Sequence, residues 1–192
     1  ADLKALAINA DISMPAFIRA VVHNCLLQIL PNSSAIIAGS EDIEHLLQLY
    51  LGVRRLHTAL KVFKKFSDQL NPEWLAILKQ TATLLSDYYQ LAHLAATIES
   101  HLQQQGAPKV DWRLEVSKIR VKPINAVRAN DFQLTLIELI AFTMSAADIE
   151  EKATILAIDK LPKVLSKQHK KLLKIEIGNN DLTDKKANID IK

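Results

Sequence analysis

The sequence has few of the residues that break helices or cross-link chains. Its 192 residues include only 4 glycines, 6 prolines and 1 cysteine. A single cysteine excludes an internal disulfide and fits a reducing compartment, so we expect a cytoplasmic protein. Alternation of apolar and polar residues between turn residues is almost absent, which argues against a β-sheet. Abundant leucine, alanine and lysine favour helices instead, and we expect the all-α class.

The sequence also lacks the motifs that would carry catalysis, metal binding or membrane insertion. Its 6 histidines never fall three or four residues apart, the spacing of metal ligands on one helix. The glycines are isolated, so none forms a phosphate-cradling loop, and no nucleophile elbow or zincin motif occurs. No apolar run approaches about 18 residues, and the N-terminus lacks a signal-peptide pattern. We therefore expect no enzyme, cofactor, metal site or membrane span.

Apolar residues make up 49% of the chain, enough for a buried core in a helical bundle. Residues 1–13 are expected to be a connector, and residues 110–131 to be a short helix or an irregular segment. Proline and polar residues predict the other boundaries: Pro31 should end or bend the first helix, Ser40 should cap the second, and Pro162 should kink the last. The helices are expected at about 15–30, 44–66, 72–105, 131–146 and 148–177.

The stretch from Glu44 to Phe66 organises the chain, because it predicts one long helix with an apolar and a basic face. The apolar stripe consists of Leu49, Val53, Leu56, Leu60 and Phe63. The basic residues beside it are Arg54, Arg55, His57, Lys61, Lys64 and Lys65. No acidic residue occurs from His45 to Phe66, so no carboxylate on this helix relieves the repulsion among them. An external anion is expected to do so.

A second basic segment lies near the C-terminus. Its lysines share about 100° of a helical wheel, and no acidic residue separates Asp159 from Glu176. They are Lys160, Lys163, Lys167, Lys170, Lys171 and Lys174. The whole chain has a net charge of only +3, so positive charge is concentrated on these two segments. The plainer alternative, a solvated helix face, stays open for both.

The segment EHLLQLYLGVRRLHTALKVF resembles the first signature of the CHAD family, the conserved histidine α-helical domains. That signature runs approximately H-Q-x-R-V-G-L-R-R-L-R-x-A-L. The matching residues are Gln48, Gly52, Arg54, Arg55, Leu56, Ala59 and Leu60. Leu47 replaces the signature histidine, Tyr50 replaces the first arginine, and His57 replaces the last arginine.

Three later segments extend the resemblance. LSDYYQLAHL occupies the place of the second signature without its charged residues, and HKKLLK resembles a family H-x-R-R-L-L-K stretch. DKKANIDIK resembles the opening of a second copy of the first signature. The resemblance implies two pseudo-repeated helical halves. The first would cover residues 1–108, including the connector, and the second would be incomplete at 109–192.

In the CHAD family, basic residues line a groove that binds inorganic polyphosphate or other phosphate-rich polymers. The resemblance therefore implies a non-catalytic polyanion-binding module. It can accompany a fused triphosphatase-like CYTH domain, whose E-x-E-x-K strand is absent here. The alternative is a degenerate relative that serves as a protein-interaction or structural module. We do not expect nucleic acid as a partner, because aromatic residues do not interleave with the basic ones.

Overall fold

The structure, a computed structural model, describes residues 11–106, 122–146 and 154–171. Its named elements are α1 (Met14–Ile37), α2 (Ile43–Phe63), the 3-10 turn η1 (Lys64–Phe66), α3 (Glu73–Gln104), α5 (Pro123–Arg128) and α6 (Asn130–Met144). A further helix runs over 157–171. Within the described ranges, β-type pairing is limited to one isolated bridge, between Ser13 and Leu156. The predicted all-α class is confirmed.

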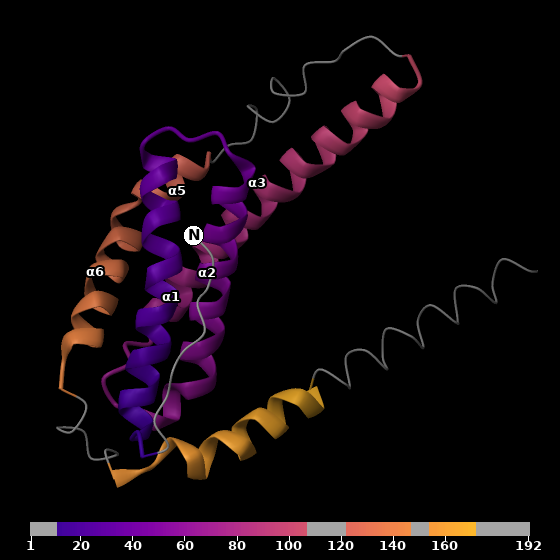
Figure 1. Ribbon diagram of the computed structural model, residues 1–192. Coiled ribbons are helices and arrows are strands. Elements are labelled where there is room, and N and C mark those ends of the chain that lie inside the picture. Colours follow the sequence, from indigo (N-terminus) through magenta and orange to yellow (C-terminus); the bar gives the residue numbers. More distant parts are fainter. Residues whose placement is uncertain (1–10, 107–121, 147–153, 172–192) are drawn as a thin grey trace, which may run out of the picture.

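The bundle is built around α1 and α2. Figure 1 shows these helices side by side, with α6 along the outer side of α1. The predicted apolar stripe of α2 is confirmed, because all its members are buried in one core cluster. They are Leu49, Val53, Leu56, Leu60 and Phe63. From α3, Trp74, Leu78 and Leu85 join the same cluster, so the first part of that helix belongs to the bundle.

Helices α1 and α2 approach closely at Gly52. A Cβ atom added to this residue would lie 2.9 Å from Cγ1 of the Ile29 side chain, closer than real Cβ contacts come. Ile29 is fully buried and cannot swing into solvent. The glycine in the signature is therefore explained by packing, since any larger residue would push α1 away from α2.

The first helix is longer than the sequence predicts. We expected Pro31 to end or bend it, but α1 continues through Pro31 to Ile37. The Asn32 side chain donates a hydrogen bond of 2.7 Å to the carbonyl of Gln28, and Asn32 is fully buried. Burial of the following Ile36 against the core also stabilises the added turns. Tertiary packing thus overrides a local helix breaker.

The start of α2 also differs from the prediction. Asp42, rather than Ser40, is the N-cap, and its carboxylate accepts a 2.9 Å hydrogen bond from the backbone N–H of Glu44. Ser40 instead lies 2.8 Å from Nδ1 of His45. Serine and aspartate are both good N-caps, so the path of the loop before α2 decides which of the two residues caps the helix.

Two predictions for the second half are wrong. The sequence of α6 is apolar nearly all round, which predicts burial on every side, but only one face, including Phe132 and Leu139, is buried, while Leu134 and Ile137 are 59% and 60% exposed. The last helix was expected to start at Asp148. Residues 154–156 are not α-helical, and the helix begins at 157 because the segment before it pairs with residues 12–14.

By length and composition, α1 is apolar enough to cross a membrane. Core helices of globular proteins have the same properties, and α1 buries Phe17, Ile18 and Val22 against the rest of the bundle. It also buries the charged residue Arg19, which a core helix tolerates when the guanidinium is hydrogen-bonded. Its Nη2 donates to Gln69 Oε1 over 2.7 Å.

The packing at Gly52 leads to a first prediction. Gly52→Ala should lower the free energy of unfolding by about 1–2 kcal/mol, because overpacking against Ile29 exceeds the gain in helix propensity. Urea denaturation followed by circular dichroism measures this. Adding Ile29→Val to Gly52→Ala should recover part of the lost free energy of unfolding. If Gly52→Ala alone stabilised the protein, the close approach of α1 and α2 at this residue would be absent.

Candidate functional site

The two basic segments meet at one end of the bundle. A hollow of about 470 Å³ lies between the end of α2 with η1 and the 157–171 helix. Seven lysines line it: Lys61, Lys64, Lys65, Lys160, Lys163, Lys167 and Lys171. Its other lining residues are Val62, Phe66, Val164 and Gln168, so among the described residues no carboxylate lines the hollow. We call it the lysine hollow.

The α2 side of the lysine hollow is shaped by a change of helix type. After Phe63 the chain tightens into η1, whose last residue, Phe66, is buried in the core. The tighter turn leaves Lys64 and Lys65 exposed. The ammonium of Lys65 lies 4.7 Å from the centre of the Phe66 ring, a cation–π contact that orients one of the cations.

The opposite side of the hollow is held in place through the chain's N-terminal segment. Two backbone hydrogen bonds join residues 12–14 to residues 155–157. Met14 N–H donates to the carbonyl of Ile155 over 2.6 Å, and Ala157 N–H donates to that of Ile12 over 2.9 Å. Ala157 and Val164 are buried, which fixes the rotation of the 157–171 helix. We call this pairing the terminal clasp.

The lysines of the 157–171 helix also line a second hollow of about 670 Å³. Lys163, Lys167, Lys170 and Lys171 contribute to it, together with Pro162 and Ser166. Three of these lysines line both hollows, so the two form one continuous basic surface across the helix. A helical wheel places Leu165 opposite these lysines, on an apolar side with Leu161, yet Leu165 is 62% exposed. Lys174 lies outside the described residues.

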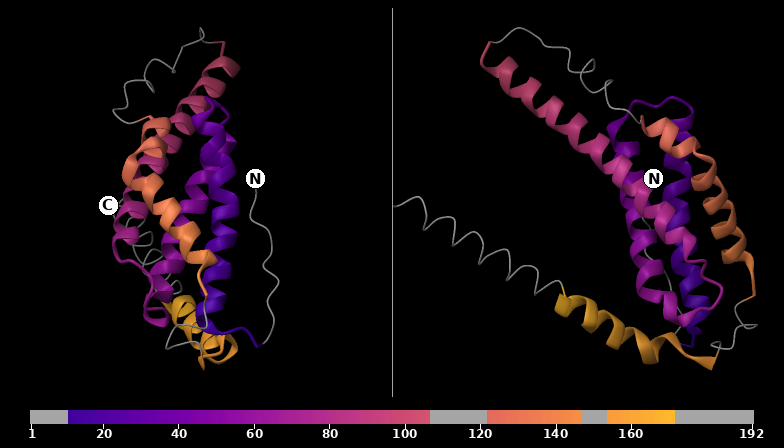
Figure 2. Two further views of the ribbon diagram at one scale, coloured as in Figure 1. Left: turned by 90° about the vertical axis from the view of Figure 1, so that its left-hand side faces the viewer. Right: turned by 180° about the vertical axis from the view of Figure 1, so that it is seen from behind.

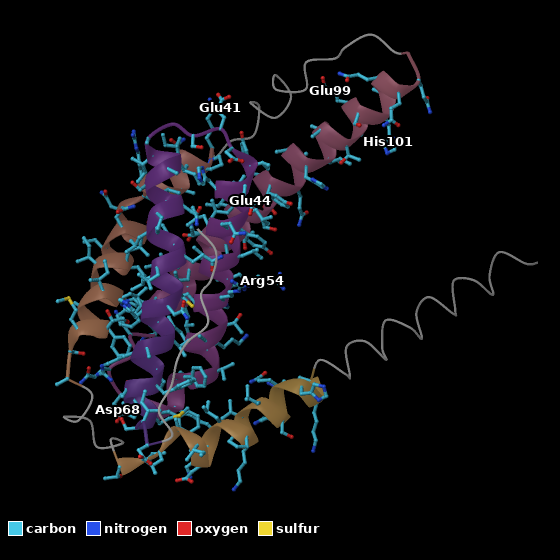
Figure 3. The ribbon with its side chains drawn as sticks, viewed as in Figure 1. Glu41, Glu44, Arg54, Asp68, Glu99 and His101 are labelled. Carbon is cyan, nitrogen blue, oxygen red and sulfur yellow. The ribbon has the colours of Figure 1, made fainter. Side chains whose placement is uncertain are left out.

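The remaining basic residues of α2 lie away from the lysine hollow. Arg54 is exposed on the side of α2, as Figure 3 shows, and its Nη1 donates to the hydroxyl of Tyr50 over 3.2 Å. Tyr50 therefore does two things: its ring packs against the core, and its hydroxyl holds an arginine. Arg54 thus presents its charge to solvent apart from the lysines.

Arg55 belongs to a polar chain between α1 and α2. Its Nη1 donates to Gln28 Oε1 over 3.1 Å, and the Gln28 amide donates to Gln48 Oε1 over 2.6 Å. Gln48 in turn donates to Glu44 over 2.7 Å. Gln28 is fully buried, so its amide needs these partners. The signature residues Gln48 and Arg55 thereby help to pair the two helices.

His57 lies among cations from two helices. Burial lowers the pKa of its imidazole below the usual 6.5, and the charges of Lys61 and Lys79 lower it further. The sequence analysis missed Lys79, because this lysine of α3 stands alone in a stretch of mixed composition. Only the folded chain reveals that it adds to the positive field. In the free protein His57 is therefore neutral near pH 7, unlike the arginine of the signature.

The described residues hold no group of three or more His, Cys, Asp or Glu side chains that suits a metal ion. Cys25 is buried, and burial raises the pKa of its thiol to about 11. It is therefore a packing residue rather than a nucleophile. What the site offers is a concentration of exposed ammonium groups, which carry compact positive charges on flexible side chains.

Comparison with known proteins shows the family of this chain. The family model described as "CHAD domain" matches residues 20–187, most of the chain. The chain belongs to the CHAD domain family. A crystal structure of the CHAD domain from the plant Ricinus communis is similar, with a TM-score of 0.67 and 26% sequence identity. That match covers 90% of this chain and 58% of the plant chain. No curated protein sequence matches.

Membership gives the signature a structural meaning in this CHAD domain. Gly52 permits the close approach of α1 and α2, and Gln48 and Arg55 extend the polar chain between them. These three residues are explained by the fold without any ligand. The division into halves at residues 108 and 109 stays a prediction, and DKKANIDIK lies outside the described residues.

The environment of His57 gives a second prediction. In the free protein its imidazole should titrate below pH 6.5, since burial, Lys61 and Lys79 all disfavour the cation. Lys61→Gln should raise this pKa, whereas Lys171→Gln, which removes a lysine elsewhere in the hollow, should change it less. NMR titration of the histidine ring protons measures both. A wild-type pKa at or above 6.5 would contradict the described surroundings.

Proposed function

We propose that this CHAD domain is a non-catalytic module that binds inorganic polyphosphate or a similar phosphate-rich polyanion at the lysine hollow. The observation that carries the proposal is that lysines from two segments about a hundred residues apart in sequence line a single hollow without a described carboxylate among them. Bringing like charges together opposes folding, so the arrangement is best explained by an anion that offsets the repulsion.

The shape of the basic surface suits a chain rather than a single small anion. The lysine hollow and the second hollow share three lysines, so cations continue around the 157–171 helix. The described part of that helix, residues 157–171, has 15 residues and spans about 22 Å. A linear polymer of phosphates can contact several lysines along it at once, whereas one phosphate ion can contact only a few.

Lysine alone supplies the charge in both hollows. Ammonium groups act as mobile point charges, while arginine grips phosphate oxygens with two parallel hydrogen bonds. Arg54 and Arg55 do not line either hollow. We therefore propose binding that is governed by charge density and chain length, that discriminates weakly among polyphosphates, and that weakens steeply with salt. An accessory role beside a fused CYTH-type domain stays a prediction from the family resemblance.

Binding of long-chain polyphosphate, measured by isothermal titration calorimetry at several salt concentrations, tests the proposal. Lys163→Glu with Lys167→Glu should weaken binding at least about tenfold at low salt and flatten its salt dependence, because each lost phosphate contact lowers the slope. Both residues are exposed, so the fold should survive, which circular dichroism checks.

A matched control makes the same change in net charge elsewhere. Arg54→Glu with Lys122→Glu alters exposed residues that line neither hollow, so binding should fall much less. Equal losses in the two variants would place binding outside the lysine hollow. Polyglutamate provides a further comparison. Equal or tighter binding of this carboxylate polymer would favour an acidic protein partner over a polyphosphate.

A further inference from the structure

Three basic side chains lie together where α2 packs against α3, beside the lysine hollow. Figures 1 and 2 show the first part of α3 running along α2, with the 157–171 helix crossing one end of the bundle. His57 and Lys61 are one turn apart on α2 and share a face, and the charge of Lys79 of α3 acts on the same imidazole. Lys61 also lines the lysine hollow. This His57 cluster therefore continues the basic surface of the hollow onto α3.

The helices that carry the cluster supply no carboxylate close to it. No acidic residue occurs from His45 to Phe66, and on α3 none lies between Glu73 and Asp87. These two carboxylates are about 9 and 12 Å from Lys79 along the helix axis, beyond the one-turn spacing at which side chains pair. In the last described helix, Asp159 lines neither hollow. Lys79 thus adds its charge to the cluster without an acidic neighbour on its own helix.

The other elements next to α2 do not reverse this charge. Helix α1 contains no acidic residue, and its basic groups are Arg19, which is hydrogen-bonded to Gln69, and the exposed His23. The turn η1 adds the exposed Lys64 and Lys65. The electrostatic environment of the His57 cluster is therefore positive, as it is in the lysine hollow.

The protonation state of His57 depends on what lies beside it. In the free protein, burial and the charges of Lys61 and Lys79 lower the pKa of the imidazole, so it is neutral near pH 7. A phosphate chain at the cluster would bring negative charge next to the ring, which favours the imidazolium form. A protonated ring donates hydrogen bonds from both nitrogens. Proton uptake and anion binding at this position therefore favour each other.

We propose that polyphosphate bound in the lysine hollow extends past Lys61 to His57 and Lys79, and that protonation of His57 strengthens this binding. The proposal rests on the proposed function and adds to it a contact region on α3 and a dependence on pH. Affinity should be constant well above the pKa that His57 has in the complex, and should rise as the pH falls through that value. Interior phosphates of a long polyphosphate are strong acids, so the ligand keeps its charge over this range.

Calorimetric titration of the whole chain with long-chain polyphosphate at about pH 7.5 and about pH 5.5 tests the pH dependence. The gain in affinity at the lower pH should be about three- to tenfold larger for the wild type than for His57→Gln, since tenfold corresponds to a pKa raised by one unit on binding. His57→Arg, with a permanent charge, should bind more tightly than the wild type at the higher pH and should lose this part of the pH dependence.

A matched control removes another histidine of the basic surface. His169→Gln alters an exposed residue of the 157–171 helix that lines neither hollow, so the wild-type pH dependence should remain. Equal pH dependence in the wild type and in His57→Gln would overturn the proposal, while a loss of binding in Lys163→Glu with Lys167→Glu would still place the polymer in the lysine hollow. Absence of polyphosphate binding at both pH values would overturn the proposed function as well.

NMR titration gives a readout that does not rely on affinities. Saturating polyphosphate should raise the pKa of the His57 ring by about one unit, because the bound phosphates stabilise the imidazolium. His101, which Figure 3 shows near the free end of α3, should shift less. An unchanged pKa of His57 in the complex would contradict contact between the polymer and the cluster.

Salt dependence tests the path onto α3. Lys79→Gln should reduce the slope of affinity against salt by about one phosphate contact, whereas Lys122→Gln, an exposed lysine that lines neither hollow, should leave the slope unchanged. Both lysines are exposed, so the fold should survive, which circular dichroism checks. Identical slopes for Lys79→Gln and the wild type would confine the polymer to the hollow and overturn the proposed path.

Discussion

The close approach of α1 and α2 at Gly52 is the constraint on which the rest of the structure depends. It brings Gln28 of α1 within reach of Gln48 and Arg55, so that a buried amide is satisfied by hydrogen bonds. It also sets the direction of α2, and with it the position at which the chain tightens into η1. The lysines of η1 reach the 157–171 helix only because the core below them is fixed.

The family signature therefore combines two kinds of residue. Gln48, Gly52 and Arg55 support the pairing of α1 and α2, whereas Arg54 lies on the surface, where its guanidinium donates to the hydroxyl of Tyr50. In this CHAD domain the charge that gathers in a hollow comes from lysines beyond the signature. The fold can thus be kept by selection on packing while the position and the chemistry of the charged surface change.

Periodicity allowed much of this to be predicted from the sequence. The apolar stripe of α2 and the two basic segments follow from spacing alone, because side chains on a helix must share a face every three or four residues. The hollow could not be predicted in detail. A helical wheel places Arg54 and Lys61 on one side of α2, but they lie about 10 Å apart along the helix axis, and the 157–171 helix meets only the end of α2. Likewise, the continuation of α1 through Pro31 and the exposure of one face of α6 depend on contacts with residues distant in sequence.

The terminal clasp has a consequence for how this domain responds to its surroundings. Two backbone hydrogen bonds, the buried Ala157 and Val164 and the partly buried Ile155 and Leu161 hold a helix rich in lysine against another cationic segment. Electrostatic repulsion among the lysines therefore opposes the terminal clasp, the short pairing of residues 12–14 with residues 155–157. An anion bound in the lysine hollow would offset this repulsion, so anion binding and formation of the terminal clasp are thermodynamically linked. A bound polymer would stabilise the packing of the 157–171 helix against the bundle, and the concentration of that polymer would set the fraction of molecules in which this helix is docked.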